Sequence, residues 1–320
     1  MLLLVVAAPG CGDSGDRTGP TEIVGLEIYN EAIAEARLEE KQQKVRRLER
    51  KLEAAKAAQN QGQAGDSLAP SKSSADLDAL GDQLGAEVGG TIGTPGAAPL
   101  VAGSLQSGSA WSTIKVPIAL EVIDEAGGTS GLSSAQQSEI TAALTASDNE
   151  AAADLFDDLV AQNGSVGSAS SAVTQTLRDA GDAETVVSTE GRDGFSSYGQ
   201  TDWSLGAQWQ FMSGLLNGCV GSSDAQSLVL DQMRSVTSDT WGLGSVGVPA
   251  LWKGGWGPGV DGRYLARQMG AVEIGGQQYA ITLAVIPDSG DFGSAQADAT
   301  AVAKWLVEHA PGSGASPGCP

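Results

Sequence analysis

The sequence has very little histidine and cysteine, and this scarcity excludes several classes of site. Its 320 residues include one histidine, His309, and three cysteines, Cys11, Cys219 and Cys319. Zinc sites built on several histidines cannot be made from this set, so we expect no metal and no other cofactor. A Ser-His-Asp triad would need His309 as its base, and the one G-x-S-x-G match, at 314–318, lies in a Gly/Ser/Pro tail without the strand-turn-helix context of a nucleophile elbow. Any nucleophile here therefore needs a base other than histidine.

Basic residues are also scarce. The chain has 18 lysines and arginines against 39 acidic residues, which gives a formal net charge of −21. Binding of nucleic acid needs a basic surface for the phosphates, so this balance argues against a nucleic-acid partner. No stretch reaches the roughly 20 apolar residues that span a bilayer. Hydrophobic residues make up 41% of the chain, which is enough for a sizeable core.

The N-terminus carries a short apolar run that ends near Cys11. Residues 2–8 read Leu-Leu-Leu-Val-Val-Ala-Ala and are followed by Pro-Gly-Cys. This resembles the end of a bacterial lipoprotein signal peptide, with Cys11 as the lipid acceptor. The resemblance implies an extracytoplasmic protein that its lipid anchors to a membrane of the cell envelope. The alternative is an apolar N-terminus with an incidental cysteine. If Cys11 carries lipid, Cys219 and Cys319 remain as a pair, which predicts one disulfide, with two free thiols as the alternative.

Residues 22–58 are predicted to form one long helix, because the stretch has no proline and its apolar residues are spaced as in a heptad repeat. Leu38, Val45, Leu48 and Leu52 follow steps of seven, three and four residues. Three alternatives remain for this helix. It is a spacer that holds the following domain off the membrane, a coiled-coil arm that forms a homo-oligomer, or a single solvated helix.

Composition divides the whole chain into successive segments. They are a signal peptide with its lipobox at 1–11, a tether at 12–21, the long helix at 22–58, a flexible linker at 59–75, a globular domain at 76–310 and a tail at 311–320. Within the domain an extended, glycine-rich segment at 84–108 comes first. Helical patterns follow at 113–126, 134–146, 149–162, 168–179, 205–216 and 223–235.

A hairpin and a final helix close the domain. The hairpin runs from 264–274 through Gly275-Gly276 to 277–286, and the helix covers 293–309. Extended segments at both ends with helices between them indicate an α+β fold, in which one sheet is made from the two termini and a helical insert separates its halves.

Three short motifs stand out in this domain. The tetrapeptide 112–115 (Ser-Thr-Ile-Lys) opens an apolar helical run, and a spacing of three residues places Ser112 and Lys115 on one helix face. A serine hydroxyl is a poor nucleophile by itself, but a desolvated lysine that loses its proton can act as its base. The second motif is 147–149 (Ser-Asp-Asn), at a helix N-terminus, and the third is 253–255 (Lys-Gly-Gly), between two tryptophans.

Each motif alone is a weak signal. The first fixes only two residues, the second is also an ordinary helix cap, and the third is also an ordinary turn. Together they are stronger, because each occurs once and they follow one another in a fixed order. From residue 76 onward the chain has only three lysines, Lys115, Lys253 and Lys304, and two of these lie inside the motifs.

This set resembles the S-x-x-K, S-D-N and K-T-G signature of class A β-lactamases and penicillin-binding proteins. The runs at 111–117 (Trp-Ser-Thr-Ile-Lys-Val-Pro) and 253–258 (Lys-Gly-Gly-Trp-Gly-Pro) are similar to those of lactamase-like serine hydrolases from high-GC Gram-positive bacteria. The resemblance covers most of residues 80–310. It implies an antiparallel sheet from both termini, flanked by helices, with an all-helical insert.

The resemblance also implies a role for each motif residue. Ser112 would attack a carbonyl carbon and form an acyl-enzyme, and Lys115 would take the proton of its hydroxyl. Ser147 would pass a proton to the leaving nitrogen. Asn149 would hold a substrate amide, and Lys253 would place positive charge against Ser147 and a substrate carboxylate.

The third motif would also supply the strand that binds the substrate, with Gly255 and Trp256 in contact with it. The backbone N–H groups of Ser112 and Trp256 would form the oxyanion hole. Arg263, ten residues beyond Lys253, would bind the substrate carboxylate as an arginine does in the class A pattern. A surface residue is the alternative for Arg263.

Two departures from the pattern bear on the reaction. Gly254 replaces the family's threonine or serine, so one hydroxyl contact to a substrate carboxylate is absent. Glu190 lies in the interval of the deacylating glutamate but without the surrounding pattern, and we favour a solvated loop carboxylate for it. We therefore predict a serine hydrolase acting on β-lactams, peptidoglycan peptides or a related amide or ester. The alternatives are an inactive domain that binds a cell-wall ligand or a protein, and an envelope lipoprotein whose long helix is its functional part.

Overall fold

The computed structural model describes residues 72–312, 314, 318 and 319. The chain separates into two units, Met1–Ala69 and Pro70–Pro320, and every described residue belongs to the second. The predicted signal peptide with Cys11, the tether at 12–21 and the long helix at 22–58 lie outside the described residues, as does most of the predicted linker. No helix in the described part is both long enough and apolar enough to cross a bilayer.

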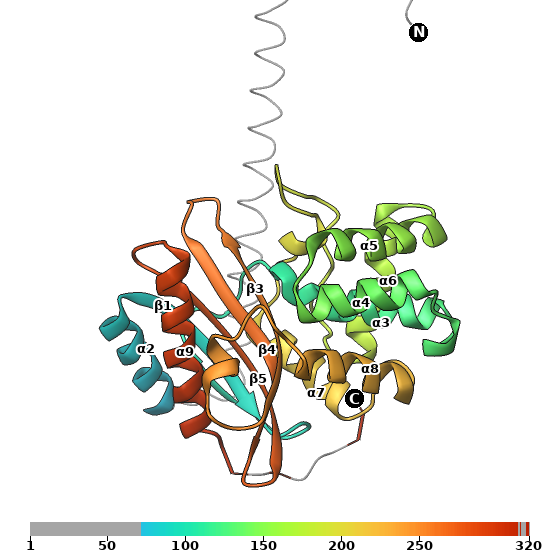
Figure 1. The fold of residues 1–320 in the computed structure, drawn as a ribbon. Coiled ribbons are helices and arrows are strands. Elements are labelled where there is room, and N and C mark those ends of the chain that lie inside the picture. The colour runs from blue at the N-terminus through green and yellow to red at the C-terminus, as the bar shows by residue number, and fades with distance from the viewer. Residues whose placement is uncertain (1–71, 313, 315–317, 320) are drawn as a thin grey trace, which may run out of the picture. The chain divides into compact units, whose positions relative to one another are not determined.

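The centre of the domain is a five-stranded antiparallel sheet (Figure 1). Its strands are β1 (Ala86–Gly93), β2 (Leu100–Gly103), β3 (Ala250–Pro258), β4 (Tyr264–Ile274) and β5 (Gln277–Pro287). Their order across the sheet is β2-β1-β5-β4-β3, so the two N-terminal strands lie beside the three C-terminal ones. The prediction of one sheet made from the two ends of the domain is confirmed.

The hairpin between β4 and β5 forms at the predicted place. Ile274 is opposite Gln277, so the turn has only two residues, Gly275 and Gly276. Their φ angles are 59° and 81°, and glycine adopts such positive values without the steric penalty of a side chain. A two-residue hairpin turn of type I′ needs positive φ at both positions, which explains why two glycines separate these strands.

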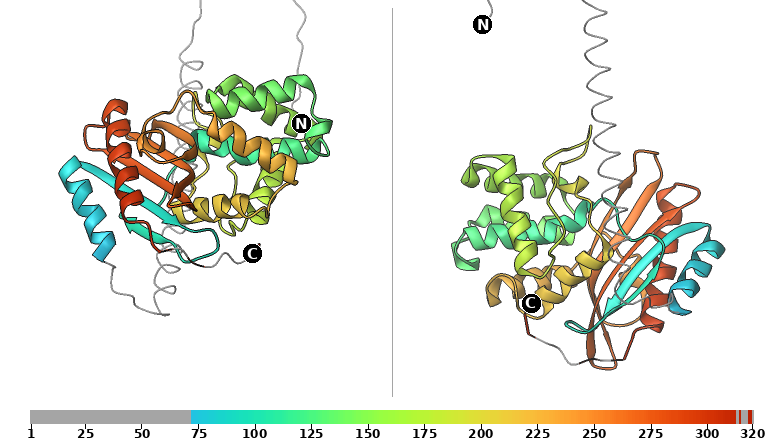
Figure 2. Two further views of the ribbon diagram at one scale, coloured as in Figure 1. Left: turned by 60° about the horizontal axis from the view of Figure 1, so that its bottom comes forward. Right: turned by 180° about the vertical axis from the view of Figure 1, so that it is seen from behind.

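Helices cover both faces of the sheet, as Figures 1 and 2 show. On one side lie α2 (Lys72–Leu84) and α9 (Phe292–Glu308), and on the other lies a helical part. The helices of this part are α3 (Lys115–Glu125), α4 (Ser134–Thr145), α5 (Asn149–Asn163), α6 (Val166–Asp179), α7 (Leu205–Leu216) and α8 (Ser223–Arg234). Two neighbouring glycines of β1 show how closely both faces are covered. The bare backbone of Gly89 faces Leu205 of α7, and that of Gly90 faces Leu306 of α9.

The sequence prediction was wrong at the start of the domain. The linker was expected to reach residue 75, but α2 begins at Lys72 and no helix had been predicted over 72–84. Leu77, Leu80 and Leu84 follow steps of three and four, and Leu77 is completely buried. Residue types in this stretch favour helix only weakly, so packing on the sheet stabilises α2 more than local preference does. Gly81 permits that packing, because a Cβ there would lie 2.8 Å from Val88 Cγ2.

Two apolar clusters form the core. One fills the helical part, and the other lies between the sheet and the pair α2 and α9. Cys219, in the loop between α7 and α8, forms a disulfide with Cys319, and their Cα atoms are 5.2 Å apart. The predicted pairing of these two cysteines is therefore present. It fastens the segment after α9 to the helical part.

Candidate active site

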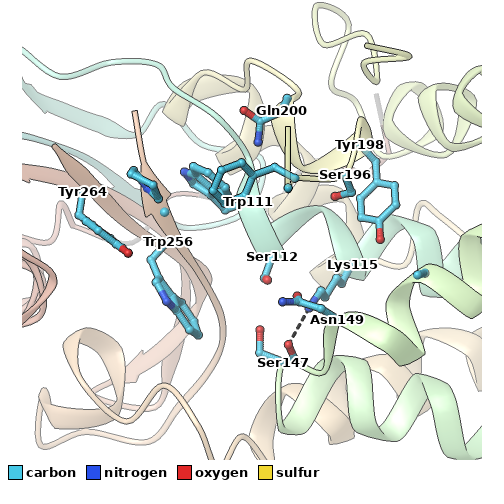
Figure 3. Close-up of a pocket in the computed structure, with 15 residues that line it drawn as sticks. Trp111, Ser112, Lys115, Ser147, Asn149, Ser196, Tyr198, Gln200, Trp256 and Tyr264 are labelled. Atoms are coloured by element: carbon cyan, nitrogen blue, oxygen red, sulfur yellow. Dashed lines mark hydrogen bonds between the residues drawn. The ribbon is translucent and has the colours of Figure 1, made fainter. Parts of the chain in front are cut away.

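A pocket of about 430 Å³ opens between strand β3 and the helical part, and it is lined by residues of the first two sequence motifs and by the residues that directly follow the third (Figure 3). Ser112 and Lys115 come from the first motif, and Ser147 and Asn149 from the second. Trp256, directly after the third motif, lines the opposite wall. In Figure 3 the side chains of Ser112, Lys115, Ser147 and Asn149 point toward one another.

Ser112 lies in a one-turn 3₁₀ helix, η1 (Trp111–Ile114), directly before α3. The residue before it, Trp111, has a φ of 49°, a left-handed conformation that large side chains rarely adopt. Such strain persists only where the surroundings hold it, and it occurs most often at functional sites. The strained residue therefore sets the direction in which the chain enters the Ser112 turn.

Two glycines of β3 let this turn lie directly against the sheet. A Cβ at Gly255 would be 2.8 Å from the backbone nitrogen of Ser112, and one at Gly257 would be 2.4 Å from the ring of Trp111. Lys253, Gly255 and Gly257 share one face of β3, because side chains alternate along a strand. The glycine-rich third motif thus places a lysine and two bare backbone segments on the face that meets Ser112.

Lys115 points into the protein, and only 2% of it is exposed. Its Nζ donates to the backbone oxygens of Ser147, at 2.7 Å, and Asp148, at 3.1 Å, and to Oδ1 of Asn149, at 2.8 Å. Burial, together with the nearby charge of Lys253, lowers the pKa of Lys115 from 10.5 to about 7. Near neutral pH this amine is therefore present both with and without its extra proton.

Ser147 lies between the two buried lysines. Its Oγ accepts a hydrogen bond from Lys253 Nζ at 2.8 Å, while its backbone oxygen accepts the one from Lys115. Its φ is 58°, again left-handed. Asp148 caps α5 through Oδ1, which accepts from the backbone N–H groups of Glu150 and Ala151. The predicted helix N-terminus at the second motif is thus present, and it fixes the backbone around Ser147.

Lys253 is fully buried and has a charged partner that the sequence did not indicate. Its Nζ lies 3.6 Å from Oδ2 of Asp239, which is itself buried, and it donates to the backbone oxygen of Gly254 at 2.9 Å. Burial lowers the pKa of Lys253 to about 8, although Asp239 opposes this shift. Burial also raises the pKa of Asp239. Asp239 belongs to no recognisable motif, so only the fold could reveal this pair.

Asp239 also explains the departure at Gly254. A Cβ on Gly254 would lie 2.6 Å from Oδ2 of Asp239, so a threonine or serine does not fit there while the carboxylate keeps its place. Where the family pattern has a hydroxyl in the third motif, this chain has the bare backbone of Gly254, and the buried carboxylate of Asp239 lies behind it. This carboxylate contacts Lys253 rather than the pocket.

The structure does not bring Arg263 to the pocket. It lies directly before β4, 37% of its side chain is exposed, and its guanidinium pairs with Asp261 and Glu87 at 2.7 Å each. The predicted role in binding a substrate carboxylate is therefore not supported, and the surface alternative describes this residue. Two adjacent carboxylates hold it at the end of the strand.

Glu190 is also outside the pocket. Its side chain is exposed, and its backbone forms a local turn with Ser188. Among the described residues that line the pocket there is no carboxylate at all. The structure therefore places Glu190 as the solvated loop carboxylate that we favour from the sequence, and not beside Ser112 where a deacylating base would be needed.

The loop before α7 supplies part of the pocket that sequence analysis missed. Phe195 and Tyr198 of this loop line the pocket, and the ring of Phe195 meets Trp111 edge to face at 5.2 Å. Arg192 lies over the Phe195 ring at 4.5 Å and donates to the backbone oxygen of Pro258 at the end of β3. The loop is therefore fastened across the strained residue before Ser112. Its sequence is rich in Gly and Ser and carries no pattern that predicts this position.

Ser112 lies in η1, three residues before Lys115, and its side chain lines the pocket and is half-buried. Among the described residues it has no hydrogen-bond partner, whereas Lys115 uses three donors on other acceptors. An ammonium has three N–H donors, but a neutral amine has two and a lone pair. When Lys115 loses its proton, one of the three contacts must therefore be given up, and the amine gains a lone pair that can accept a proton.

The sequence matches no family model and no curated protein. Several solved structures have a similar fold. The TLA-3 extended-spectrum β-lactamase is 15% identical with a TM-score of 0.59, and the match covers 74% of this chain and 98% of that one. A β-lactamase from Chitinophaga pinensis is 15% identical with a TM-score of 0.60, covering 73% and 98%.

A variant of PBP-A in an acyl-enzyme complex with penicillin G is 20% identical with a TM-score of 0.54, and the match covers 73% of this chain and 96% of that one. These matches cover nearly the full length of the solved structures, so they include both the sheet and the helical insert of this chain. The domain that follows residue 70 therefore has the fold of the serine β-lactamases and penicillin-binding proteins.

Proposed function

We propose that this protein is a serine hydrolase that forms an acyl-enzyme on Ser112. The observation that supports this most strongly is the buried amine of Lys115, one turn from Ser112, with a pKa near 7. A lysine that is half neutral at physiological pH is suited to act as a general base. Ser147, which contacts Lys115 through its backbone oxygen, and Lys253, which donates to Ser147 Oγ, complete the group.

The reaction follows from these positions. Neutral Lys115 takes the proton from Ser112 Oγ while Oγ forms a bond to the substrate carbonyl carbon. The carbonyl oxygen becomes an oxyanion, for which the backbone N–H groups of Ser112 and Trp256 are the proposed donors. When the carbon–nitrogen bond breaks, Ser147 Oγ gives its proton to the leaving nitrogen. Lys253, hydrogen-bonded to that oxygen, stabilises the negative charge on it until the proton that Lys115 took from Ser112 passes to Ser147 Oγ and restores its hydroxyl.

For the substrate we propose a strained or peptidic amide, as in β-lactams and the peptides of peptidoglycan. The solved structures with this fold include β-lactamases and PBP-A, and a mutant of PBP-A is seen in an acyl-enzyme complex with penicillin G. Asn149 lines the pocket with its carboxamide, which is able to bind a substrate amide. Aromatic rings of Trp111, Phe195 and Tyr198 offer an apolar surface to the acyl substituent.

We further propose that the acyl-enzyme is long-lived. Deacylation needs a water that a base activates, and the residues described around the pocket include no carboxylate. Glu190 is on an exposed loop. The protein would thus bind penicillin covalently and release it slowly, rather than destroy it rapidly.

The test is intact-mass measurement after incubation with a fluorescent penicillin. We expect wild-type protein to gain the mass of one probe, and Ser112→Ala to gain none. Dilution into unlabelled buffer should leave the adduct in place for many minutes. Absence of any adduct with penicillins and with fluorophosphonates would instead support an inactive domain that binds a cell-wall ligand or a protein.

We also propose that the protein is a lipoprotein outside the cytoplasm, with lipid on Cys11 and residues 22–58 as a spacer or oligomerisation arm. The apolar run before Cys11 and the heptad-like spacing support this proposal. Metabolic labelling with a fatty-acid analogue tests it. We expect label and membrane association in wild-type cells and loss of both in Cys11→Ala. Labelling that persists in the variant contradicts the anchor.

A further inference from the structure

Arg267, in the middle of β4, is a buried cation that is held by hydrogen bonds rather than by an ion pair, and the charge of Asp202 acts on it only from beyond ion-pair distance. It has no exposed surface, and no ion pair to it is found in the described part of the chain. Arg263, four residues earlier, shows the contrast, because it is exposed and paired with two carboxylates. A charge removed from water without a counter-charge is unfavourable, so its hydrogen bonds must compensate for it.

The guanidinium of Arg267 donates hydrogen bonds to segments of the chain that surround Ser112. Nη1 donates to the backbone oxygens of Gly108, at 2.7 Å, and Ser109, at 3.2 Å. Nη2 donates to the backbone oxygen of Trp203, at 3.0 Å, and to Oε1 of Gln208, at 2.8 Å. Two of the four acceptors are thus the peptide groups that lead directly into strained Trp111.

A second path joins the same guanidinium to the other side of the turn. Gln208 Nε2 donates to Thr113 Oγ1 at 2.9 Å, and Thr113 Oγ1 donates to the backbone oxygen of Ala110 at 2.6 Å. Thr113 directly follows Ser112. Arg267 therefore holds the chain both before and after the serine.

The register of the sheet explains why this residue can do so. Arg267 is directly opposite Gly255 on β3, so both face the same side of the sheet. Gly255 is the glycine whose missing side chain lets the Ser112 backbone approach β3. Gly255 leaves room for the Ser112 turn, and Arg267 beside it places N–H donors next to that turn.

We propose that Arg267 is a positioning residue that holds the Ser112 turn so that the hydroxyl and the backbone N–H of Ser112 both face the substrate carbonyl. This inference rests on the proposed acylation of Ser112. It assigns to a buried charge beside the Ser112 turn a role in the chemistry of the pocket, although the arginine does not touch the substrate.

The experiment is saturation kinetics of acylation by a fluorescent penicillin, which separates the binding constant from the rate at saturation. Arg267→Met keeps much of the side-chain volume and removes the donors. A displacement of about 1 Å in a catalytic group can lower a rate about 100-fold, so we expect a loss of roughly that size in the rate at saturation. The binding constant should change less than about threefold. Arg263→Met, the same change at the surface, is the matched control and should react like wild type.

A pair of variants at Thr113 keeps the test decisive if Arg267→Met does not fold. Thr113→Val removes the hydroxyl that links Gln208 to Ala110, and we expect a rate roughly ten times lower because part of the turn is released. Thr113→Ser retains the hydroxyl and should recover most of the rate. Thermal unfolding of each variant shows whether a lower rate merely follows lower stability.

Two results would overturn the inference alone. One is an Arg267→Met protein that folds, is less stable and still acylates at the wild-type rate. The other is equal acylation by the valine and serine variants at position 113. A wild-type protein that no probe acylates would remove the proposed function and this inference together, so the two failures are distinguishable.

Discussion

At the scale of single residues, the protonation of two buried lysines should control the reaction. Lys115, with a pKa of about 7, must lose its proton to accept one from Ser112, so acylation should rise with pH up to that value. Lys253, with a pKa of about 8, must keep its charge beside Ser147, so acylation should fall at higher pH. We expect a narrow bell-shaped profile of the second-order acylation rate between these values, changing about tenfold per pH unit on its limbs. A profile that stays flat from acid to alkaline pH would contradict these roles.

The buried carboxylate beside Lys253 should set the alkaline limb of that profile. Asp239 opposes the loss of the Lys253 proton, so Asp239→Asn should lower the pKa of Lys253 further and move the limb to lower pH. The acid limb, governed by Lys115, should move less, because Asp239 acts on Lys115 only weakly. The pH dependence of acylation measures both limbs. Asp298→Asn, in α9 and outside the pocket, is the control, and an equal shift in that variant would argue against a direct effect of Asp239.

At the scale of elements, the close contact of β3 with η1 should tolerate no side chain at position 255. In Gly255→Ala the new Cβ would lie 2.8 Å from Ser112 N and 2.9 Å from Ala110 O, both backbone atoms that cannot move without moving the turn. We expect acylation to fall about 100-fold or more, by the same geometric argument that applies to any displaced catalytic group.

Gly206→Ala in α7 is the control for this substitution, because a Cβ there meets nothing within 4 Å. Alanine favours helix over glycine by about 0.5–1 kcal/mol, so this variant should melt slightly higher and acylate normally. Acylation rates and thermal unfolding of the two variants test whether the contact between β3 and η1 is needed for acylation. Normal acylation by Gly255→Ala would show that the contact is not needed.

Most elements were predictable because their signals are local. Helix α4 begins with a capping box at Ser133, and the β4–β5 turn has its two glycines. Strand β3 was seen only as a motif, since it lies at the edge of the sheet and its glycines read as a turn. Helix α2 was missed because its stability comes from Leu77 packing on strands, and that contact is not visible in a short window of sequence.

At the scale of the whole molecule, the disulfide should add much of the stability of the domain. Cys219 and Cys319 are 100 residues apart in the sequence. Closing a loop of that length in the unfolded chain is worth up to about 4.7 kcal/mol in the chain-entropy account. We expect Cys219→Ser to lower the free energy of unfolding in urea by about 3–5 kcal/mol. Wild-type protein under reducing conditions should match it, and a loss below about 1 kcal/mol would show that the bond matters little.

The sequence by itself determined the order of the three motifs, the periodic helices and the hairpin, whereas the pairing of Cys219 with Cys319 needed the fold. The first three depend on residue type and short spacing, which the chain carries in any conformation. The tertiary structure decided that Asp239 pairs with Lys253, that Arg263 and Glu190 stay outside the pocket, and that Arg267 holds the Ser112 turn. Each of these depends on where distant segments meet, because burial and charge interactions arise from neighbours in space and not from neighbours in sequence.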